Sequence, residues 1–268
     1  YMWARPEVMA HDVLLQKKSL YLNVPFFLGR SAFYFLAWSL VALRVSSLSL
    51  ALDVKPTKED ARKLRLASGS GLALYVLTVT FASVDWVMSL DPHWFSTIFG
   101  ALFMIGQMLS AFACIIPVTI LLAREKPMSE IVNPGTVYDL GNLLLAFVML
   151  WAYLAFSQFL IIWAGNLPEE IPWYLERLKG GWQLMALAII LLHFALPFMM
   201  LISRATKRNA RLLLPVAVLV LVMRFVETFW VVSPAGEVHS GFGVHWIDLA
   251  APLGLGGLWV GLFMRELK

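Results

Sequence analysis

The sequence contains a single cysteine, Cys114, among 268 residues. One cysteine excludes an intrachain disulfide and is too few to ligate an iron–sulfur cluster. The sequence also lacks a CxxCH motif, which excludes covalently attached haem. We therefore expect this chain to carry no redox cofactor of its own.

Charged residues are also scarce. They make up 14% of the chain, against 60% hydrophobic residues, and the mean hydropathy is +0.76. Ordinary soluble domains contain about 25% charged residues. The alternating pattern of a membrane β-barrel is absent, so helices are the expected spanning elements. The sequence predicts an all-α, polytopic membrane protein, with residues 1–268 forming one integral membrane domain.

Hydropathy predicts seven spans, each long enough to cross a bilayer as a helix. They cover about 26–50, 66–88, 95–122, 140–163, 181–203, 212–232 and 247–263. The last contains glycines that would let a neighbouring helix approach closely, namely Gly254, Gly256, Gly257 and Gly261.

Lysine and arginine are distributed unequally between the two sides of these spans. By the positive-inside rule the richer side faces the cytoplasm, which places Tyr1 outside and Lys268 inside. This topology accounts for the basic charge, so no nucleic-acid partner is needed. The cytoplasmic set comprises Lys55, Lys58, Arg62, Lys63, Arg65, Arg124, Lys126, Arg204, Lys207, Arg208, Arg211, Arg265 and Lys268. An outer aromatic belt is predicted at Trp86, Trp94, Trp230 and Trp246.

Arg224 and Glu227 lie within the apolar run of about 212–232. An ionisable side chain near mid-membrane costs roughly 2.5–3.5 kcal/mol on insertion scales. A spacing of three places both residues on one helix face, where each can offset part of the other's cost. Two interpretations remain open: an ion pair that holds helices together, or a site for protons or a quinol head group.

Three further polar residues are candidates for a proton path or quinone site. Asp85 lies near the outer end of the second span, where it is either solvated or part of a path. His193 lies near the middle of the fifth span, and Pro197 removes the backbone donor that would bond the His193 carbonyl. A lone histidine on an apolar face is either a satisfied core residue or a functional group, and two-histidine ligation of a b-type haem is not expected.

Gln107, near the centre of the third span, could extend a polar path together with Thr78 and Thr80. Asp91, before Pro92, is a plausible N-cap for the third span, and His93 is expected to cap at the interface. We expect no catalytic residue and no metal site in this chain.

Four segments resemble the NrfD-like (polysulfide-reductase-like) integral membrane family, and in particular its second member in bacterial alternative complex III, a quinol:cytochrome c oxidoreductase. The segments are KKSLYLNVPFFLGR (17–30), RLASGSGLALYVLTVTFASVDWVMSLDPHWFSTIFG (65–100), HFALPF (193–198) and RFVETFW (224–230). The resemblance implies a fold of about ten helices, of which these spans would be the C-terminal seven. It also implies the inner membrane of a bacterium as the location.

The resemblance further implies partner subunits: a multihaem cytochrome c, an iron–sulfur protein, a monohaem cytochrome c and a homologous NrfD-like subunit. Haem c and iron–sulfur clusters would belong to those partners, with quinol or menaquinol as a possible substrate. The expected role is a membrane subunit of a respiratory or photosynthetic electron-transport complex that supplies a proton path or a quinone-binding surface. The alternatives are a purely structural scaffold and a secondary transporter, for which paired broken helices in internal repeats would be typical.

Overall fold

Seven helices are long and apolar enough to cross a membrane in the computed structural model, which describes residues 1–235 and 243–267. The chain is 84% helical, which confirms the prediction of an all-α, polytopic membrane protein. The seven are α3 (Val24–Val54), α4 (Lys58–Trp86), α5 (Phe99–Leu122), α7 (Pro134–Gly165), the composite of α9 (Trp182–Ala188), η3 (Ile189–Ala195) and α10 (Leu196–Ile202), α12 (Ala210–Val232) and α13 (Trp246–Glu266).

Short elements connect these helices or precede them. They are η1 (Met2–Ala4), α1 (Pro6–His11), α2 (Val13–Lys18), η2 (Met88–Leu90), α6 (Met128–Ile131), α8 (Ile171–Arg177), α11 (Arg204–Arg208) and η4 (Ser233–Ala235).

Side-chain caps determine where several of the long helices begin. The Asn23 carboxamide accepts a hydrogen bond from the Phe26 amide at the start of α3. The Thr57 hydroxyl oxygen accepts a hydrogen bond from the Asp60 amide at the start of α4. Acidic residues in the first turn of α4 also interact favourably with the positive end of the helix dipole. Helix α4 therefore begins eight residues before the apolar span predicted from 66.

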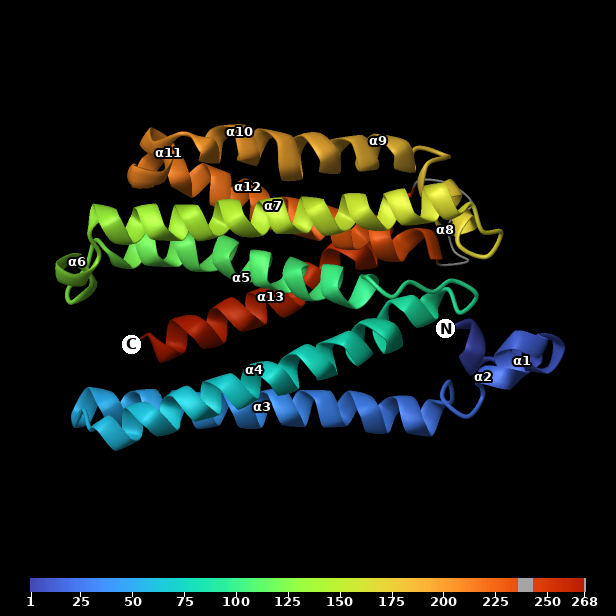
Figure 1. Ribbon diagram of the computed structural model, residues 1–268, viewed down its shortest axis with the longest axis horizontal. Coiled ribbons are helices and arrows are strands. Elements are labelled where there is room, and N and C mark those ends of the chain that lie inside the picture. The colour runs from blue at the N-terminus through green and yellow to red at the C-terminus, as the bar shows by residue number, and fades with distance from the viewer. Residues whose placement is uncertain (236–242, 268) are drawn as a thin grey trace.

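The helices form two groups (Figure 1). Helices α3 and α4 make an antiparallel hairpin, and α4 contacts α5 towards the end of the molecule where α8 lies. Helices α5, α7, α12 and the α9–η3–α10 composite pack together and contain the main hydrophobic core. This core includes Leu109, Ile116, Leu144, Val148 and Val216.

Helix α13 has no buried residue. Around the four glycines predicted to permit close packing, no atom of another described helix lies within 4 Å of the position that a Cβ would take. The close approach expected from these glycines is therefore not made by the described part of this chain.

Aromatic side chains gather inside the protein at the end where α8 lies. Trp94 is 3% exposed and stacks on Trp173, with ring centroids 4.6 Å apart. The prediction of Trp94 as part of a lipid-facing belt is therefore wrong, whereas Trp246 is 70% exposed. Arg177 lies under this cluster and donates to the carbonyl oxygens of Trp173 (2.9 Å) and Val231 (2.6 Å). Its burial lowers the pKa of Arg177 to about 10, so the guanidinium stays charged at neutral pH.

The segment around Asp91 also differs from the prediction. Helix α5 begins at Phe99 with Ile98 as its N-cap and no side-chain cap, so Asp91 does not cap the third span. His93 Nε2 instead lies 2.8 Å from an Asp12 carboxylate oxygen, within hydrogen-bond distance. Asp12 also caps α2 by accepting from the amides of Leu14 and Leu15. The contact between Asp12 and His93 holds the N-terminal segment, residues 1–22, against the loop before α5.

The Asp12 contacts predict that the local stability of residues 1–22 depends on pH. Burial raises the pKa of Asp12, but hydrogen bonds from Leu15 and Leu14 and the contact with His93 outweigh it, so the pKa lies below the ordinary 3.8. A carboxyl with a lowered folded-state pKa stabilises above its unfolded value, and the contribution is lost as the pH falls through the folded value. Hydrogen exchange of residues 1–22, corrected for intrinsic rates and referenced to α4, should therefore rise below about pH 4. Asp12→Asn should show the faster exchange already at neutral pH; equal exchange in both proteins at pH 7 would contradict this.

Candidate functional site

The Glu227 carboxylate is the centre of a buried polar cluster formed by α12, α7 and η3. Trp151 Nε1 donates to Glu227 Oε1 at 2.8 Å, and Arg224 Nη1 pairs with Glu227 Oε2. The predicted contact between Arg224 and Glu227 on one helix face is confirmed. His193 Nε2 lies 3.5 Å from the same Oε2. The three candidates that the sequence placed on two different spans thus lie together.

His193 is fully buried, and neither of its ring nitrogens has a hydrogen-bond partner among residues 1–235 and 243–267. The separation of 3.5 Å from Glu227 is longer than a good hydrogen bond, which has its donor and acceptor about 2.7–3.2 Å apart. The Trp151 ring meets the imidazole edge-on, with centroids 4.4 Å apart and an interplanar angle of 79°. Packing therefore holds the His193 ring in place. The residue is not a core histidine whose polar atoms are satisfied by hydrogen bonds.

The backbone around His193 is π-helical over Ile189–Ala195, between α9 and α10. Pro197 lies in the first turn of α10 and has no N–H, so the α-helical bond to the His193 carbonyl cannot form. The sequence predicts this local break, and the structure shows a full turn of altered register. Such π-helical turns are rare and are often found at functional sites.

Arg224 is positioned from the opposite side by α5. Arg224 Nε donates to Ser110 Oγ at 3.2 Å, and the Ser110 hydroxyl donates to the Gly106 carbonyl at 2.9 Å. The guanidinium lies directly against Gly106, where a Cβ would clash with it. The absence of a side chain at residue 106 therefore makes room for the Arg224 head group beside Glu227.

Asp85 belongs to a second cluster, between α3 and α4. Arg30 binds both carboxylate oxygens, with Nε and Nη2 each at 2.8 Å, and the Tyr34 hydroxyl donates at 2.7 Å. Asp85 is 0% exposed, so the interpretation of a solvated interfacial carboxylate is wrong. Its compensating charge comes from Arg30, which lies on the preceding span.

Tyr21 closes this second cluster towards the N-terminal segment. The Arg30 guanidinium lies over the Tyr21 ring, 3.8 Å from its centroid, and also donates to the Tyr21 carbonyl at 3.1 Å. Burial, reinforced by the negative charge of Asp85, raises the pKa of Tyr21 to about 12. The phenol therefore stays neutral at physiological pH.

Gln107 lies between the two clusters. Its side-chain oxygen accepts a hydrogen bond from the Tyr75 hydroxyl of α4. In the same region Trp38 Nε1 donates to Thr78 Oγ1 at 2.8 Å, whereas the Thr80 hydroxyl bonds only within its own helix, to Val76. Gln107 and Thr78 thus form hydrogen bonds between helices, whereas Thr80 contacts α5 through its methyl group, which lies against Gly100.

The side chains of these clusters that were not identified from the sequence include Arg30, Tyr34 and Trp151. Trp151 lies in the middle of an apolar run, where nothing local distinguishes it from a lipid-facing tryptophan. Arg30 and Asp85 are 55 residues apart, so their pairing depends on how two helices rotate. A search for acidic residues with a complementary arginine on the preceding span would have suggested the pair.

Among residues 1–235 and 243–267, no group of three or more histidine, cysteine, aspartate or glutamate side chains is arranged to hold a metal ion. What the buried clusters can do is hold, donate or accept protons. His239 lies outside the described residues.

Comparison with known proteins adds no assignment. No family model matches the chain, and no curated protein matches its sequence.

The contact between Gly106 and Arg224 predicts that Gly106→Ala displaces the guanidinium from Glu227. Overpacking of this kind costs about 1–3 kcal/mol. Thermal unfolding in mild detergent should show a lower midpoint for Gly106→Ala. Gly29→Ala is the matched control, because its Cβ would meet nothing within 4 Å. Equal midpoints for the two variants would contradict the role of Gly106.

The ion pair predicts non-additive effects of substitution. Arg224→Met alone leaves Glu227 uncompensated and should destabilise the protein strongly, by roughly 3–5 kcal/mol. The double variant Arg224→Met/Glu227→Gln removes both charges while keeping an acceptor for Trp151, so it should recover most of the loss. Urea or thermal unfolding of the two single variants and the double variant measures the coupling. Additive losses would show that the two charges do not depend on each other.

Proposed function

We propose that this chain is a proton-conducting membrane subunit of a quinol-oxidising electron-transport complex. The observation that carries the proposal is the fully buried His193, whose two ring nitrogens form no hydrogen bond with the described residues and which lies 3.5 Å from the Glu227 carboxylate. An ionisable pair within a membrane span is a functional-site hypothesis by default. A histidine adds a group that takes up and releases protons near neutral pH.

The cluster has the capacity for one additional proton. An ionised carboxylate offers about four acceptor sites, and Arg224 and Trp151 use one each. His193 Nε2 can therefore exchange a proton with Glu227 Oε2 after a movement of a few tenths of an ångström. Arg224 balances the negative charge while Glu227 is ionised, and proton uptake leaves a positive charge that favours onward release.

The Asp85 cluster supports a route from this centre towards the end of the molecule where α8 lies. Asp85 is the second-last residue of α4 before its end at Trp86, whereas Arg224 lies eight residues, or about 12 Å, from the end of α12. Gln107 and Tyr75 lie on the helices between them. Trp38 carries only an N–H donor and cannot relay a proton, so transfer between the clusters needs water or a side-chain movement.

The proposed orientation places the α8 end outside. The α3–α4 turn, α6, α11 and the C-terminal end of α13 lie together at one end of the molecule, and α1, α2 and α8 lie at the other (Figure 1). The lysine- and arginine-rich segments share the first of these ends, which the positive-inside rule assigns to the cytoplasm. A proton leaving past Asp85 would then be released on the outer face of a bacterial cell membrane.

The partners and cofactors of the proposal come from the resemblance to the NrfD-like subunits of alternative complex III. Quinol is the electron donor in such a complex. Its haem c and iron–sulfur clusters would be bound by a multihaem cytochrome c, a monohaem cytochrome c and an iron–sulfur subunit, beside a homologous membrane subunit. Purification in mild detergent, followed by haem staining and mass spectrometry of the co-purifying chains, tests this assembly directly. Isolation of the chain with none of these proteins would contradict it.

A structural scaffold is the competing function, and one observation favours it. The Glu227 and Asp85 carboxylates each pair with an arginine and accept a further hydrogen bond, from Trp151 and Tyr34 respectively. A carboxylate compensated in this way also serves to hold helices together. A purely structural role does not explain why the two buried ring nitrogens of His193 form no hydrogen bond with the described residues.

Variants of the central pair distinguish the two functions. In an assembled complex, Glu227→Gln and His193→Phe should each lower quinol oxidation coupled to proton release, by up to the 10²–10⁴-fold that general acid–base groups typically contribute. Glu169→Gln, in an exposed loop, is the matched control and should behave as the native protein. Infrared difference spectra on quinol oxidation should show a protonated-carboxyl band that is missing in Glu227→Gln. Full activity and unchanged spectra in assembled variants would contradict proton conduction and support the role of a structural scaffold.

A further inference from the structure

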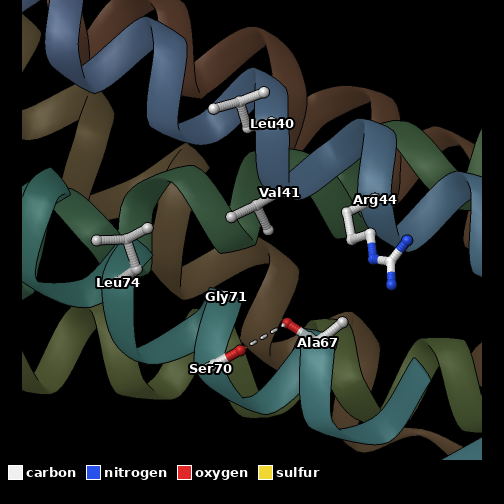
Figure 2. A pocket seen from close by; sticks show the side chains of 7 residues that line it. All are labelled: Leu40, Val41, Arg44, Ala67, Ser70, Gly71 and Leu74. Atoms are coloured by element: carbon white, nitrogen blue, oxygen red, sulfur yellow. Dashed lines mark hydrogen bonds between the residues drawn. The ribbon is translucent and has the colours of Figure 1, made fainter. Parts of the chain in front are cut away.

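A groove of about 270 Å³ runs between α3 and α4, remote from the Glu227 cluster. Its walls are Leu40, Val41 and Arg44 of α3 and Ala67, Ser70, Gly71 and Leu74 of α4 (Figure 2). Gly71 lies against Val41, where a Cβ would come within 2.6 Å of a valine methyl carbon. This close approach brings the two helices together and forms the floor of the groove.

The groove is apolar at one end and cationic at the other. Leu74, Val41 and Leu40 line the part nearer the middle of the spans, and Arg44 and Ala67 lie towards the α3–α4 turn (Figure 2). Arg44 is nine residues before Asp53, or about 13 Å along the helix axis. An arginine side chain at this depth extends along the helix so that its head group approaches the membrane surface.

Arg44 is exposed, and its guanidinium has no hydrogen bond or ion pair with any residue in the described ranges 1–235 and 243–267. The other two arginines that the sequence places in apolar spans both have a carboxylate partner: Arg30 binds Asp85 and Arg224 binds Glu227. The Ser70 hydroxyl donates to the Leu66 carbonyl at 2.9 Å, so it is not free to donate to a ligand. Recognition of an anion in the groove therefore depends on Arg44.

We infer that this groove binds an anionic phospholipid from the leaflet at the α3–α4 turn. The phosphate would pair with the Arg44 guanidinium, and one acyl chain would follow Leu40, Val41 and Leu74 towards the middle of the bilayer. The order of the polar and apolar ends matches a lipid, whose head group lies nearer the surface than its chains. A neutral quinone would fill the apolar part but would offer no negative charge to Arg44.

The surface beside the groove favours the same class of lipid. The turn and first part of α4 carry Lys55, Lys58, Arg62 and Arg65, and none of these pairs with a carboxylate in the described residues; Lys63 does pair, with Glu59 at 2.9 Å. Basic residues adjoining a span attract anionic head groups. The inference uses residues that the proposed proton route does not, and it holds whether or not that function is correct.

Photo-crosslinking in lipid nanodiscs tests the site. The full chain, with any subunits that remain bound, is placed in phosphatidylcholine containing a trace of phosphatidylglycerol or of phosphatidylcholine with a photoactivatable acyl chain. Crosslinks are then mapped to peptides within 40–74. One compensated charge near the surface is worth about 1 kcal/mol, so the phosphatidylglycerol probe should label these peptides about fivefold more than the phosphatidylcholine probe.

Four variants identify the groups responsible. Arg44→Leu should abolish the preference for phosphatidylglycerol, and Arg44→Lys should keep most of it. Arg62→Leu removes a cation on the same surface, outside the groove, and should leave most of the preference. Ser70→Leu fills the groove without changing its charge and should reduce labelling by both probes. Circular dichroism and gel filtration confirm that each variant is folded.

Three results would overturn the inference. The first is equal labelling of 40–74 by both probes in the native protein. The second is an unchanged preference in folded Arg44→Leu. The third is displacement of the phosphatidylglycerol probe by millimolar glycerol phosphate, which would show a site for a free phosphate ester rather than for a lipid.

Discussion

The lack of water in the hydrocarbon region is the constraint on which this structure depends. A carboxylate there must be compensated by the protein, because unpaired ions are costly in a medium of low dielectric constant. Glu227 and Asp85 each meet an arginine together with a ring donor, Trp151 and Tyr34 respectively. These contacts determine how neighbouring helices rotate, since turning α12 or α4 about its axis would expose a bare charge to lipid.

Packing between the helices depends on small residues for a related reason. Lipid tails are as apolar as leucine side chains, so burial alone does little to drive helices together inside a bilayer. Close approach is permitted instead at glycines, such as Gly71 against Val41, Gly141 against Lys207 and Gly106 against Arg224. At Gly106 the space left by the missing side chain is filled by the Arg224 guanidinium. The same group therefore packs against α5 and compensates the charge of Glu227.

The sequence predicts features that depend on neighbouring residues and misses those that depend on distant ones. The seven spans follow from hydropathy, and the contact between Arg224 and Glu227 follows from their spacing of three on one helix. The partner of Asp85 does not follow in this way, because Arg30 belongs to another helix and lies 55 residues away along the chain. The meeting of His193 with Glu227 also required the packing of two spans. The exposure of Trp94 was mispredicted because a tryptophan near a span end has the same local sequence in lipid and in a protein interior.

The π-helical turn at Ile189–Ala195 has a consequence for how the two halves of this span are oriented. Each residue of an α-helix advances the chain by about 100° around the axis, so the wider turn acts as one extra residue in an otherwise regular helix. If the same residues formed a continuous α-helix instead, one half of the span would rotate by about 100° relative to the other, and the imidazole would no longer face Glu227. The hydropathy of the span would not change. The meeting of these two side chains is therefore a property of helix geometry as much as of residue type, and a hydropathy profile would not reveal its loss.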